Sequence, residues 1–145
     1  SCDPFPLFWE RECFVKRLFV YQDAETADIK QFVFSLPDKQ RNKILTQIAM
    51  LILPSDMLGR PQVKHFQMKR YRSLYELRNK YQNTLIRIIF AYTSKENVVL
   101  LEAFIKNHKR KTDVALAAAL DKLRRIENNP TQFLLEVDIR QWIQE

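Results

Sequence analysis

Three consecutive apolar segments with very short connections constrain the fold of this chain more than any other feature. Residues 73–78, 84–92 and 97–106 are rich in β-branched, aromatic and aliphatic side chains, and the polar runs 79–83 and 93–96 separate them. Strands joined by connections of this length usually pair antiparallel with their neighbours. The sequence therefore predicts an antiparallel meander at the centre of the fold.

Alternation along these segments sorts their side chains onto two sheet faces, because successive residues of a strand point to opposite sides. One face is apolar and requires a covering layer of helices: Tyr75, Leu77, Ile86, Ile88, Phe90, Tyr92, Val99, Leu101, Ala103 and Ile105. The opposite face mixes charges with apolar residues: Leu74, Glu76, Arg78, Leu85, Arg87, Ile89, Ala91, Leu100, Glu102, Phe104 and Lys106. We expect helices on the first face and a charged concavity on the second.

Arg87 stands in the middle of an otherwise apolar segment. Burying a guanidinium is unfavourable unless it has a partner or faces a wet cleft. An internal ion pair with Glu76 or Glu102 is one interpretation, and an anion-binding site is another. Both can hold together, because carboxylates that position the guanidinium would also prepare it to bind a phosphate.

Positive charge is concentrated in residues 60–112. This stretch contains 13 Lys or Arg and 3 Glu, whereas the whole chain has a net charge of +7. Both histidines, His65 and His108, lie within it, and four tyrosines are interleaved with the cations: Tyr71, Tyr75, Tyr81 and Tyr92. This composition suits a polyanion whose bases can stack, although a solvated basic surface with core tyrosines explains it equally well.

Composition also excludes several classes of protein. A chain of 145 residues with a single glycine, Gly59, lacks the phosphate-cradling loops of kinases, P-loop proteins and dinucleotide-binding enzymes. Cys2 and Cys13 have neither redox nor zinc spacing, and the two histidines are far apart, so we expect no metal site and no cofactor. No secretory or membrane-spanning segment is visible, which favours the cytoplasm.

The flanking segments predict helices. Asp23 is expected to cap one helix, and Pro37 to begin a second whose buried stripe is Ile44, Leu45, Ile48, Leu51 and Ile52. Thr112 and Asp113 are expected to begin a third that ends near Asn128 and buries Leu116, Ala119, Leu120, Leu123 and Ile126.

Three regions are expected along the chain. Residues 1–12 form an aromatic arm, residues 13–128 form the domain, with a first strand at 13–21, and residues 129–145 form an extension. We expect this extension to pack on its own domain, because large apolar side chains such as Trp142 are usually buried.

Four runs, in this order, resemble the phage-derived HigB-like branch of the RelE/ParE toxin superfamily: GRPQVKHFQMKRYRSLYELR, LIRIIFAY, VVLLEAFIKNHKRKT and ALAAALDKL. The resemblance covers about residues 13–126 and is sharpest over 59–119. It implies a small RelE-like α+β domain, with an antiparallel-rich sheet of four or five strands, two N-terminal helices on one face and a C-terminal helix.

The resemblance also implies a function. The protein would be the toxin of a type II toxin–antitoxin system in a bacterial cytoplasm, neutralised by a cognate antitoxin that carries a helix-turn-helix domain. HigB- and RelE-type toxins cleave messenger RNA, usually on the ribosome, whereas ParE-type relatives poison DNA gyrase without being nucleases, so the fold alone does not decide the activity. A phage protein that binds nucleic acid without chemistry is a further alternative.

The ribonuclease interpretation assigns roles to individual residues. In metal-free cleavage the ribose 2′-hydroxyl attacks the adjacent phosphate, and the enzyme must stabilise negative charge and move two protons. Arg87 matches the strand arginine of the family and is expected to bind the phosphate, with Arg78 and Lys106 beside it. His108 is expected to transfer a proton. The residues that could substitute for it are Tyr75, Tyr92, Glu76 and Lys106.

A basic rim is expected around these residues. Seven side chains are candidates for tracking the phosphates of messenger or ribosomal RNA: Lys64, His65, Lys69, Arg70, Lys109, Arg110 and Lys111. Ordinary solubility explains any single one of them equally well.

Overall fold

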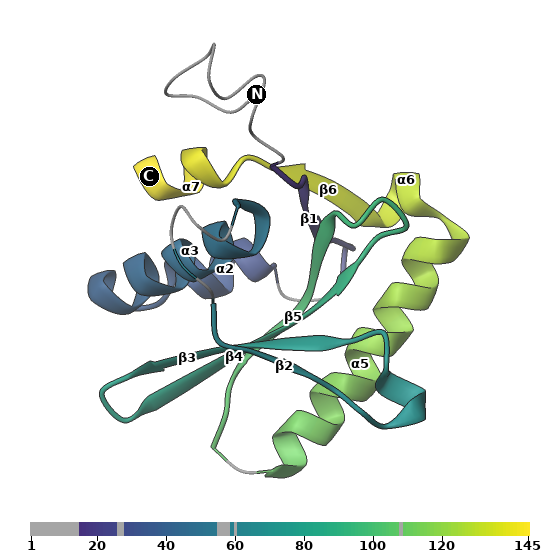
Figure 1. Cartoon of the computed structure of the whole chain (residues 1–145), viewed down its shortest axis with the longest axis horizontal. Helices are drawn as coiled ribbons and strands as arrows, with labels where there is room; N and C mark the ends of the chain where they lie inside the picture. The colour runs from purple at the N-terminus through teal and green to yellow at the C-terminus, as the bar shows by residue number, and fades with distance from the viewer. Residues whose placement is uncertain (1–14, 26–27, 55–58, 60, 108) are drawn as a thin grey trace.

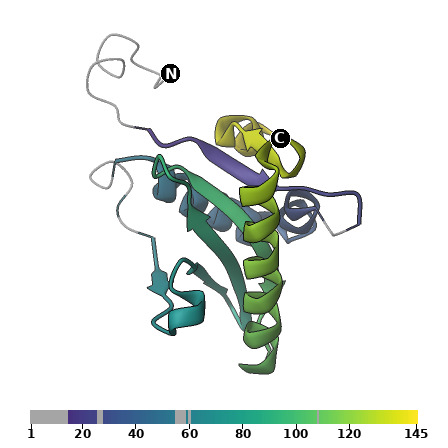
Figure 2. The ribbon, with the colours of Figure 1, turned by 90° about the vertical axis from the view of Figure 1, so that its right-hand side faces the viewer.

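The residues that the structure describes form one mixed sheet of six strands with helices on both faces (Figures 1 and 2). The structure is a computed structural model and describes residues 15–25, 28–54, 59, 61–107 and 109–145. The strands are β1 (Leu18–Tyr21), β2 (Val63–His65), β3 (Tyr75–Tyr81), β4 (Thr84–Tyr92), β5 (Val98–Ile105) and β6 (Leu134–Val137). Their spatial order is β2-β3-β4-β5-β1-β6, and all neighbours run antiparallel except β5 and β1, which are parallel.

The α+β class and the central meander are confirmed, but the sheet has six strands instead of four or five. The two strands that were not predicted, β2 and β6, have only three and four residues and are largely exposed, so they carry no clear hydrophobic alternation. Strand β1 covers only the end of the strand predicted at 13–21. The predicted aromatic arm at residues 1–12 lies outside the described residues.

The helices divide between the two faces of the sheet. They are α2 (Ile29–Phe34), α3 (Asp38–Ile52), the 3₁₀ helix η1 (Lys69–Tyr71), α5 (Lys109–Asn128), α6 (Pro130–Phe133) and α7 (Ile139–Gln144). Helices α2, α3 and α7 share one hydrophobic core with Leu77 and Ile88 of the sheet. Helix α5 packs on the opposite face, over Leu74, Ile89 and Phe104 (Figure 2).

The two helices predicted after residue 23 are confirmed, and their bounds differ from the prediction. All five residues of the predicted stripe of α3 are buried: Ile44, Leu45, Ile48, Leu51 and Ile52. Helix α2 begins at Ile29, where the carboxylate of Asp28 accepts a hydrogen bond from the backbone N–H of Lys30 at 2.8 Å. The predicted cap, Asp23, instead accepts a hydrogen bond from the hydroxyl of Tyr21 at 2.6 Å.

Helix α5 covers part of the sheet face that was expected to be an open, charged concavity. The helix begins at Lys109 rather than at Thr112, and it ends at Asn128 as predicted. Of its predicted buried residues, Leu116, Ala119, Leu120 and Ile126 are buried and Leu123 packs against the same core. The expectation of helices on one face alone was wrong, because the apolar residues of the second face are numerous enough to require a cover of their own.

The hairpin between β3 and β4 is tighter than predicted. Strand β3 continues to Tyr81, so the turn contains only Gln82 and Asn83, with Gln82 in the left-handed region at a φ of 54°. Polar residues at 79–83 suggested a longer turn. Asn79 is nevertheless buried. Its burial is tolerated because its side-chain amide donates a hydrogen bond to Gln47 at 2.6 Å and accepts one from Gln40 at 3.4 Å.

A β-bulge reverses the predicted facing of the first half of β5. Ile89 lies opposite Glu102 and Phe90 lies opposite Leu100, which leaves Leu101 without a partner on β4. Leu100 therefore joins the core under α3, whereas Leu101 joins the core under α5. Val99, which was predicted on the face under α3, likewise joins the core under α5. Strict alternation cannot reveal such a residue, because one extra position shifts the facing of all residues before it.

The C-terminal segment packs on the body of the protein, as predicted for Trp142. Strand β6 pairs antiparallel with β1 and forms an edge of the sheet. Trp142 is 6% exposed in the core under α3, and its ring makes an edge contact with Phe34 at a centroid distance of 6.1 Å. Helix α7 therefore belongs to the layer formed by α2 and α3.

Replacing Trp142 with alanine tests the contribution of this segment to stability. We expect Trp142→Ala to lower the free energy of unfolding by about 3 to 5 kcal/mol, because it leaves a large cavity beside α3. Ile143, which is 52% exposed, provides a neighbouring control, and Ile143→Ala should change stability by less than about 0.5 kcal/mol. Urea denaturation measures both values, and equal losses would contradict the described packing.

Candidate anion-binding site

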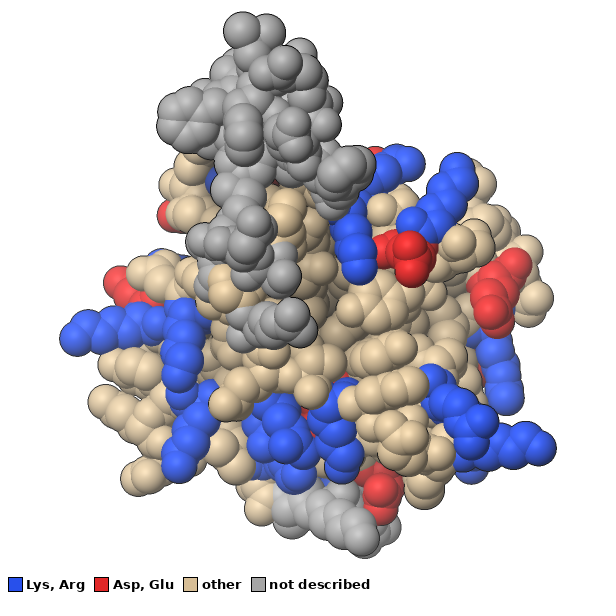
Figure 3. Space-filling view, in the orientation of Figure 1, with Lys and Arg blue, Asp and Glu red and all other residues tan. Residues whose placement is uncertain are grey.

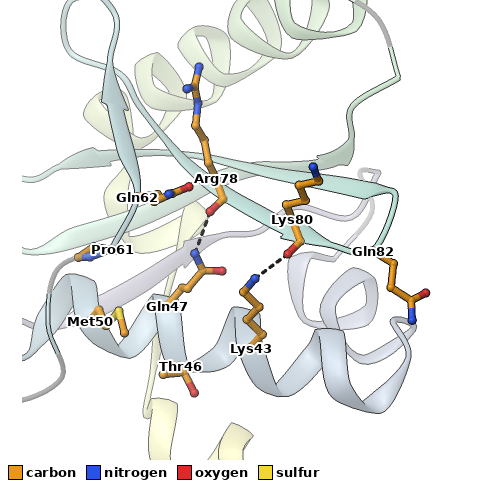
Figure 4. Close-up of a pocket in the computed structure, with 9 residues that line it drawn as sticks. All are labelled: Lys43, Thr46, Gln47, Met50, Pro61, Gln62, Arg78, Lys80 and Gln82. Carbon is orange, nitrogen blue, oxygen red and sulfur yellow. Dashed lines mark hydrogen bonds between the residues drawn. The ribbon is translucent and has the colours of Figure 1, made fainter.

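Arg78 and Arg87 occupy directly opposite positions on β3 and β4. Ile89, two residues after Arg87 on the same strand, lies in the core under α5, so alternation places the side chain of Arg87 on the α5 side of the sheet. The close-up in Figure 4 shows the side chains of Arg78 and Lys80 directed away from α3. The pairing of two adjacent strands thus brings two guanidinium groups to one region of this face.

A single buried carboxylate lies between the two arginines. Oε1 of Glu76 accepts a hydrogen bond from Nε of Arg78 at 3.2 Å, and it lies 3.6 Å from Nε of Arg87. The side chains are 1% exposed for Glu76, 10% for Arg87 and 40% for Arg78. The ion pair expected for Arg87 is therefore formed with Glu76. Glu102, the other candidate, pairs instead with Lys122 at 2.9 Å.

Hydrogen bonding in this cluster is incomplete. Nε of Arg87 and Oε2 of Glu76 are buried and have no hydrogen-bond partner among the described residues. Arg87 donates one hydrogen bond, from its NH1 group to the backbone carbonyl of Ile86 at 3.2 Å. Unpaired buried polar groups are unfavourable, so the contacts within this cluster do not fully offset its burial.

The charge of the cluster is positive. Burial lowers the pKa of Arg87, an effect that Glu76 opposes and that Arg78 reinforces. Arginine nevertheless stays charged at neutral pH, so two guanidinium groups face one carboxylate. The excess positive charge makes this region suitable for an anion.

Lys80 and Lys106 extend the positive charge toward the hairpin. Lys80 lies opposite Leu85, and the backbone N–H of Lys106 donates to the carbonyl of Leu85 at 2.8 Å. Lys106 follows Phe104 by two residues, so alternation places it on the α5 side as well. Sequence reasoning missed Lys80 because it was assigned to a turn. Its signal is that it continues the alternation of Glu76 and Arg78.

One cation of the expected rim lies next to this cluster on the sheet, and three others are exposed. Lys64 lies opposite Glu76 on β2, and its Nζ is 5.3 Å from the ring centroid of Phe66. Lys69, Arg70 and Lys111 are exposed. Figure 3 shows Lys and Arg side chains gathered in a band across the lower half of this view, where Figure 1 places β2, β3 and the beginning of α5. The side chains of Lys109 and Arg110, and the whole of His108, lie outside the described residues.

The aromatic candidates lie on the other face. His65 stacks on Tyr75 at a centroid distance of 4.2 Å, and its Nε2 lies 2.6 Å from the carbonyl oxygen of Arg72. Tyr75 contacts the ring of Tyr92 at 5.0 Å and packs against the core under α3. The sheet therefore separates His65, Tyr75 and Tyr92 from Arg87, and the structure does not bring these two tyrosines into position to replace His108.

Comparison with known proteins gives one family. Residues 31–124 match the family model described as Phage derived protein Gp49-like (DUF891). The matched stretch includes the meander and all of the cluster around Arg87. No curated protein and no solved structure matches the chain. Among the described residues, no helix is both long and apolar enough to cross a membrane.

Replacing Glu76 with glutamine tests the electrostatic balance of the cluster. We expect Glu76→Gln to lower the free energy of unfolding by about 3 to 5 kcal/mol, because Arg87 would remain buried without a countercharge. Glu127→Gln, at an exposed position near the end of α5, should leave stability unchanged.

A double variant identifies the cause of any loss of stability in Glu76→Gln. Adding Arg87→Met to Glu76→Gln should recover stability, because the uncompensated charge is then removed. Chemical denaturation of the four proteins of this cycle gives the coupling between the two residues. Purely additive effects would show that Glu76 does not balance Arg87.

Proposed function

We propose that this chain, which belongs to the phage-derived Gp49-like family, is the toxin of a type II toxin–antitoxin system and cleaves messenger RNA on the translating ribosome. The observation that carries the proposal is the pair of arginines facing each other across β3 and β4, with one buried carboxylate between them. The resemblance of this strand region to HigB-like toxins supports the same function.

The proposed reaction is an intramolecular phosphoryl transfer. The ribose 2′-oxygen forms a bond to phosphorus while the bond from phosphorus to the 5′-oxygen breaks, which leaves a 2′,3′-cyclic phosphate and a 5′-hydroxyl. Negative charge on the phosphoryl oxygens increases in the transition state. Arg87 and Arg78 would stabilise this charge through charge-assisted hydrogen bonds.

Glu76 acts in this scheme as a positioning residue. It is almost fully buried and already contacts both guanidinium groups, so it is not free to approach a ribose hydroxyl. The 2′-hydroxyl must still lose a proton and the 5′-oxygen must gain one. His108 is proposed to supply the proton to the leaving oxygen.

The basic band would hold the RNA backbone. Lys80 and Lys106 flank the arginines, and the exposed cations of the rim continue the positive surface, namely Lys64, Lys69, Arg70 and Lys111, with Lys109 and Arg110 proposed beside them. Contacts of this kind neutralise phosphates and release counterions, so binding should weaken steeply as the salt concentration rises.

A toxin of this type requires a partner that silences it. We propose a cognate antitoxin protein with a helix-turn-helix domain, acting with this chain in a bacterial cytoplasm. The pair would leave translation unaffected until the antitoxin is lost.

Messenger breaks in a translating extract test the nuclease. We expect the wild-type protein to cut messages at positions occupied by ribosomes, and Arg87→Ala to reduce cleavage by about 100- to 1000-fold, the loss typical for one transition-state donor. Primer extension maps the breaks and measures their rate. Arg124→Ala, at an exposed position on α5 outside the cluster, is the matched control and should cut at the wild-type rate.

Two further measurements make the result decisive. Thermal unfolding of Arg87→Ala and of the milder Arg87→Lys variant shows whether each is folded at the assay temperature. If the folded wild type makes no breaks in any translation state, the nuclease proposal fails. Inhibition of DNA supercoiling would then assign the protein to the gyrase-poisoning class, and RNA binding without cleavage would assign it to non-catalytic binding.

A further inference from the structure

A groove of about 740 Å³ lies between α3 and the outer edge of β3 (Figure 4). Lys43, Gln47 and Met50 of α3 form one side of it, and Gln62, before β2, forms part of the other. Gln82 lies at the hairpin end of the groove. The groove is on the opposite side of the sheet edge from the Arg78 and Arg87 guanidinium groups, and it has no part in the proposed reaction.

The floor of the groove is a stretch of strand edge without a neighbouring strand. Strand β2 pairs with β3 only as far as Leu77, and the last backbone bond runs from the N–H of Arg78 to the carbonyl of Gln62 at 2.9 Å. Beyond this point no strand among the described residues covers β3. Unpaired strand edges are templates for the pairing of a further chain.

Side chains occupy the places that a further strand would take. The amide of Gln47 donates to the carbonyl of Arg78 at 2.8 Å, and Nζ of Lys43 donates to the carbonyl of Lys80 at 2.6 Å (Figure 4). In an antiparallel sheet the N–H and C=O of one residue point to the same side, so the N–H of Lys80 also points into the groove. A peptide backbone could replace these contacts without disturbing the ladder to β4. Lys43 can rotate away, whereas Gln47 would release the carbonyl of Arg78 while it keeps the hydrogen bond that it accepts from the side chain of Asn79 at 2.6 Å.

The lining determines the charge of such a peptide. Lys43, Gln47, Gln62 and Gln82 line the groove, whereas Lys80 contributes its backbone carbonyl and directs its side chain away from α3. None of the described lining residues is Asp or Glu. Once displaced from the carbonyl of Lys80, the ammonium group of Lys43 needs a new acceptor. A carboxylate on the incoming segment provides it, and Met50 offers an adaptable apolar contact.

We infer that this groove binds an extended, acidic segment of a partner protein, which adds a strand to the edge of β3 beside Arg78 and Lys80. The strand edge from residue 78 to residue 81 is about 13 Å long, enough for about four residues of an extended chain. The inference goes beyond RNA cleavage and rests on the groove alone.

Arg78 connects this groove to the anion-binding site. Its carbonyl lies in the groove, whereas its guanidinium contacts Glu76 on the other side of the sheet. A segment that replaced Gln47 at this carbonyl would therefore contact the backbone of a residue whose side chain belongs to the anion-binding site.

Peptide binding without any RNA tests the inference. The probe is a fluorescein-labelled heptapeptide of alternating glutamate and valine, and fluorescence anisotropy measures its affinity for the full chain. We expect binding that Lys43→Glu weakens at least tenfold. Lys95→Glu is the charge-matched control: it changes an exposed residue in the turn between β4 and β5, outside the groove, and should alter the affinity less than twofold.

A methylated version of the peptide tests whether binding occurs by strand addition. The same peptide with N-methyl groups on alternate amides keeps its charge but cannot pair with the β3 edge, so it should bind at least tenfold more weakly. Equal binding of the methylated peptide, equal effects of the two lysine variants, or no binding would each overturn the inference.

A second copy of this chain is the competing occupant. A concentration-dependent dimer in sedimentation, weakened by Lys43→Glu and not by Lys95→Glu, would assign the groove to self-association and overturn the peptide proposal. Because no RNA is present in these measurements, failure of the nuclease assay would leave their outcome unaffected.

Discussion

Desolvation of the Arg87 guanidinium on the central strand governs the arrangement of the α5 side of the sheet. Taking a charge out of water costs several kcal/mol even after the protein relaxes. The attraction of a carboxylate offsets this desolvation cost only when the carboxylate is close and well oriented. Glu76 is adjacent, but at 3.6 Å from Nε of Arg87 it does not complete a hydrogen bond. Arg78 competes for the same oxygen at 3.2 Å. The folded protein therefore retains one unsatisfied N–H donor of Arg87, its Nε, in a largely dry region.

Such a group is difficult to explain by stability alone. Replacing buried ion pairs with apolar residues of similar volume is often neutral or stabilising, so the cluster is a weak source of folding energy. Its geometry is more informative, because two guanidinium groups from adjacent strands share one carboxylate and leave donors available. That arrangement suits a ligand with several negative oxygens, and the surrounding lysines increase the attraction at longer range.

Sequence reasoning identified the parts of the structure that depend on burial. An ion pair of Arg87 with Glu76 or Glu102 was predicted because a charge in an apolar strand requires a countercharge, and the stripe of α3 followed from its helical spacing. The bulge at Leu101 could not be predicted, because local strand patterns carry no sign of an extra residue. Lys80 was assigned to the turn because polar residues precede Gln82, although tertiary contacts of Asn79 keep this segment in the strand.

The neighbours of β1 have a consequence for the order of folding. Arg17 just before β1 bonds to Asn97, which is 80 residues away, and to Glu136, which is 119 residues away. The β3–β4 hairpin needs only a two-residue turn, so it can form early from local contacts, whereas β1 must wait until distant segments arrive and loop closure is complete. The paired arginines belong to the part that forms early, and β1 and β6 join the sheet at the end. During synthesis β1 would therefore remain without β5 until residue 105 has left the ribosome, and without β6 until residue 137 has followed.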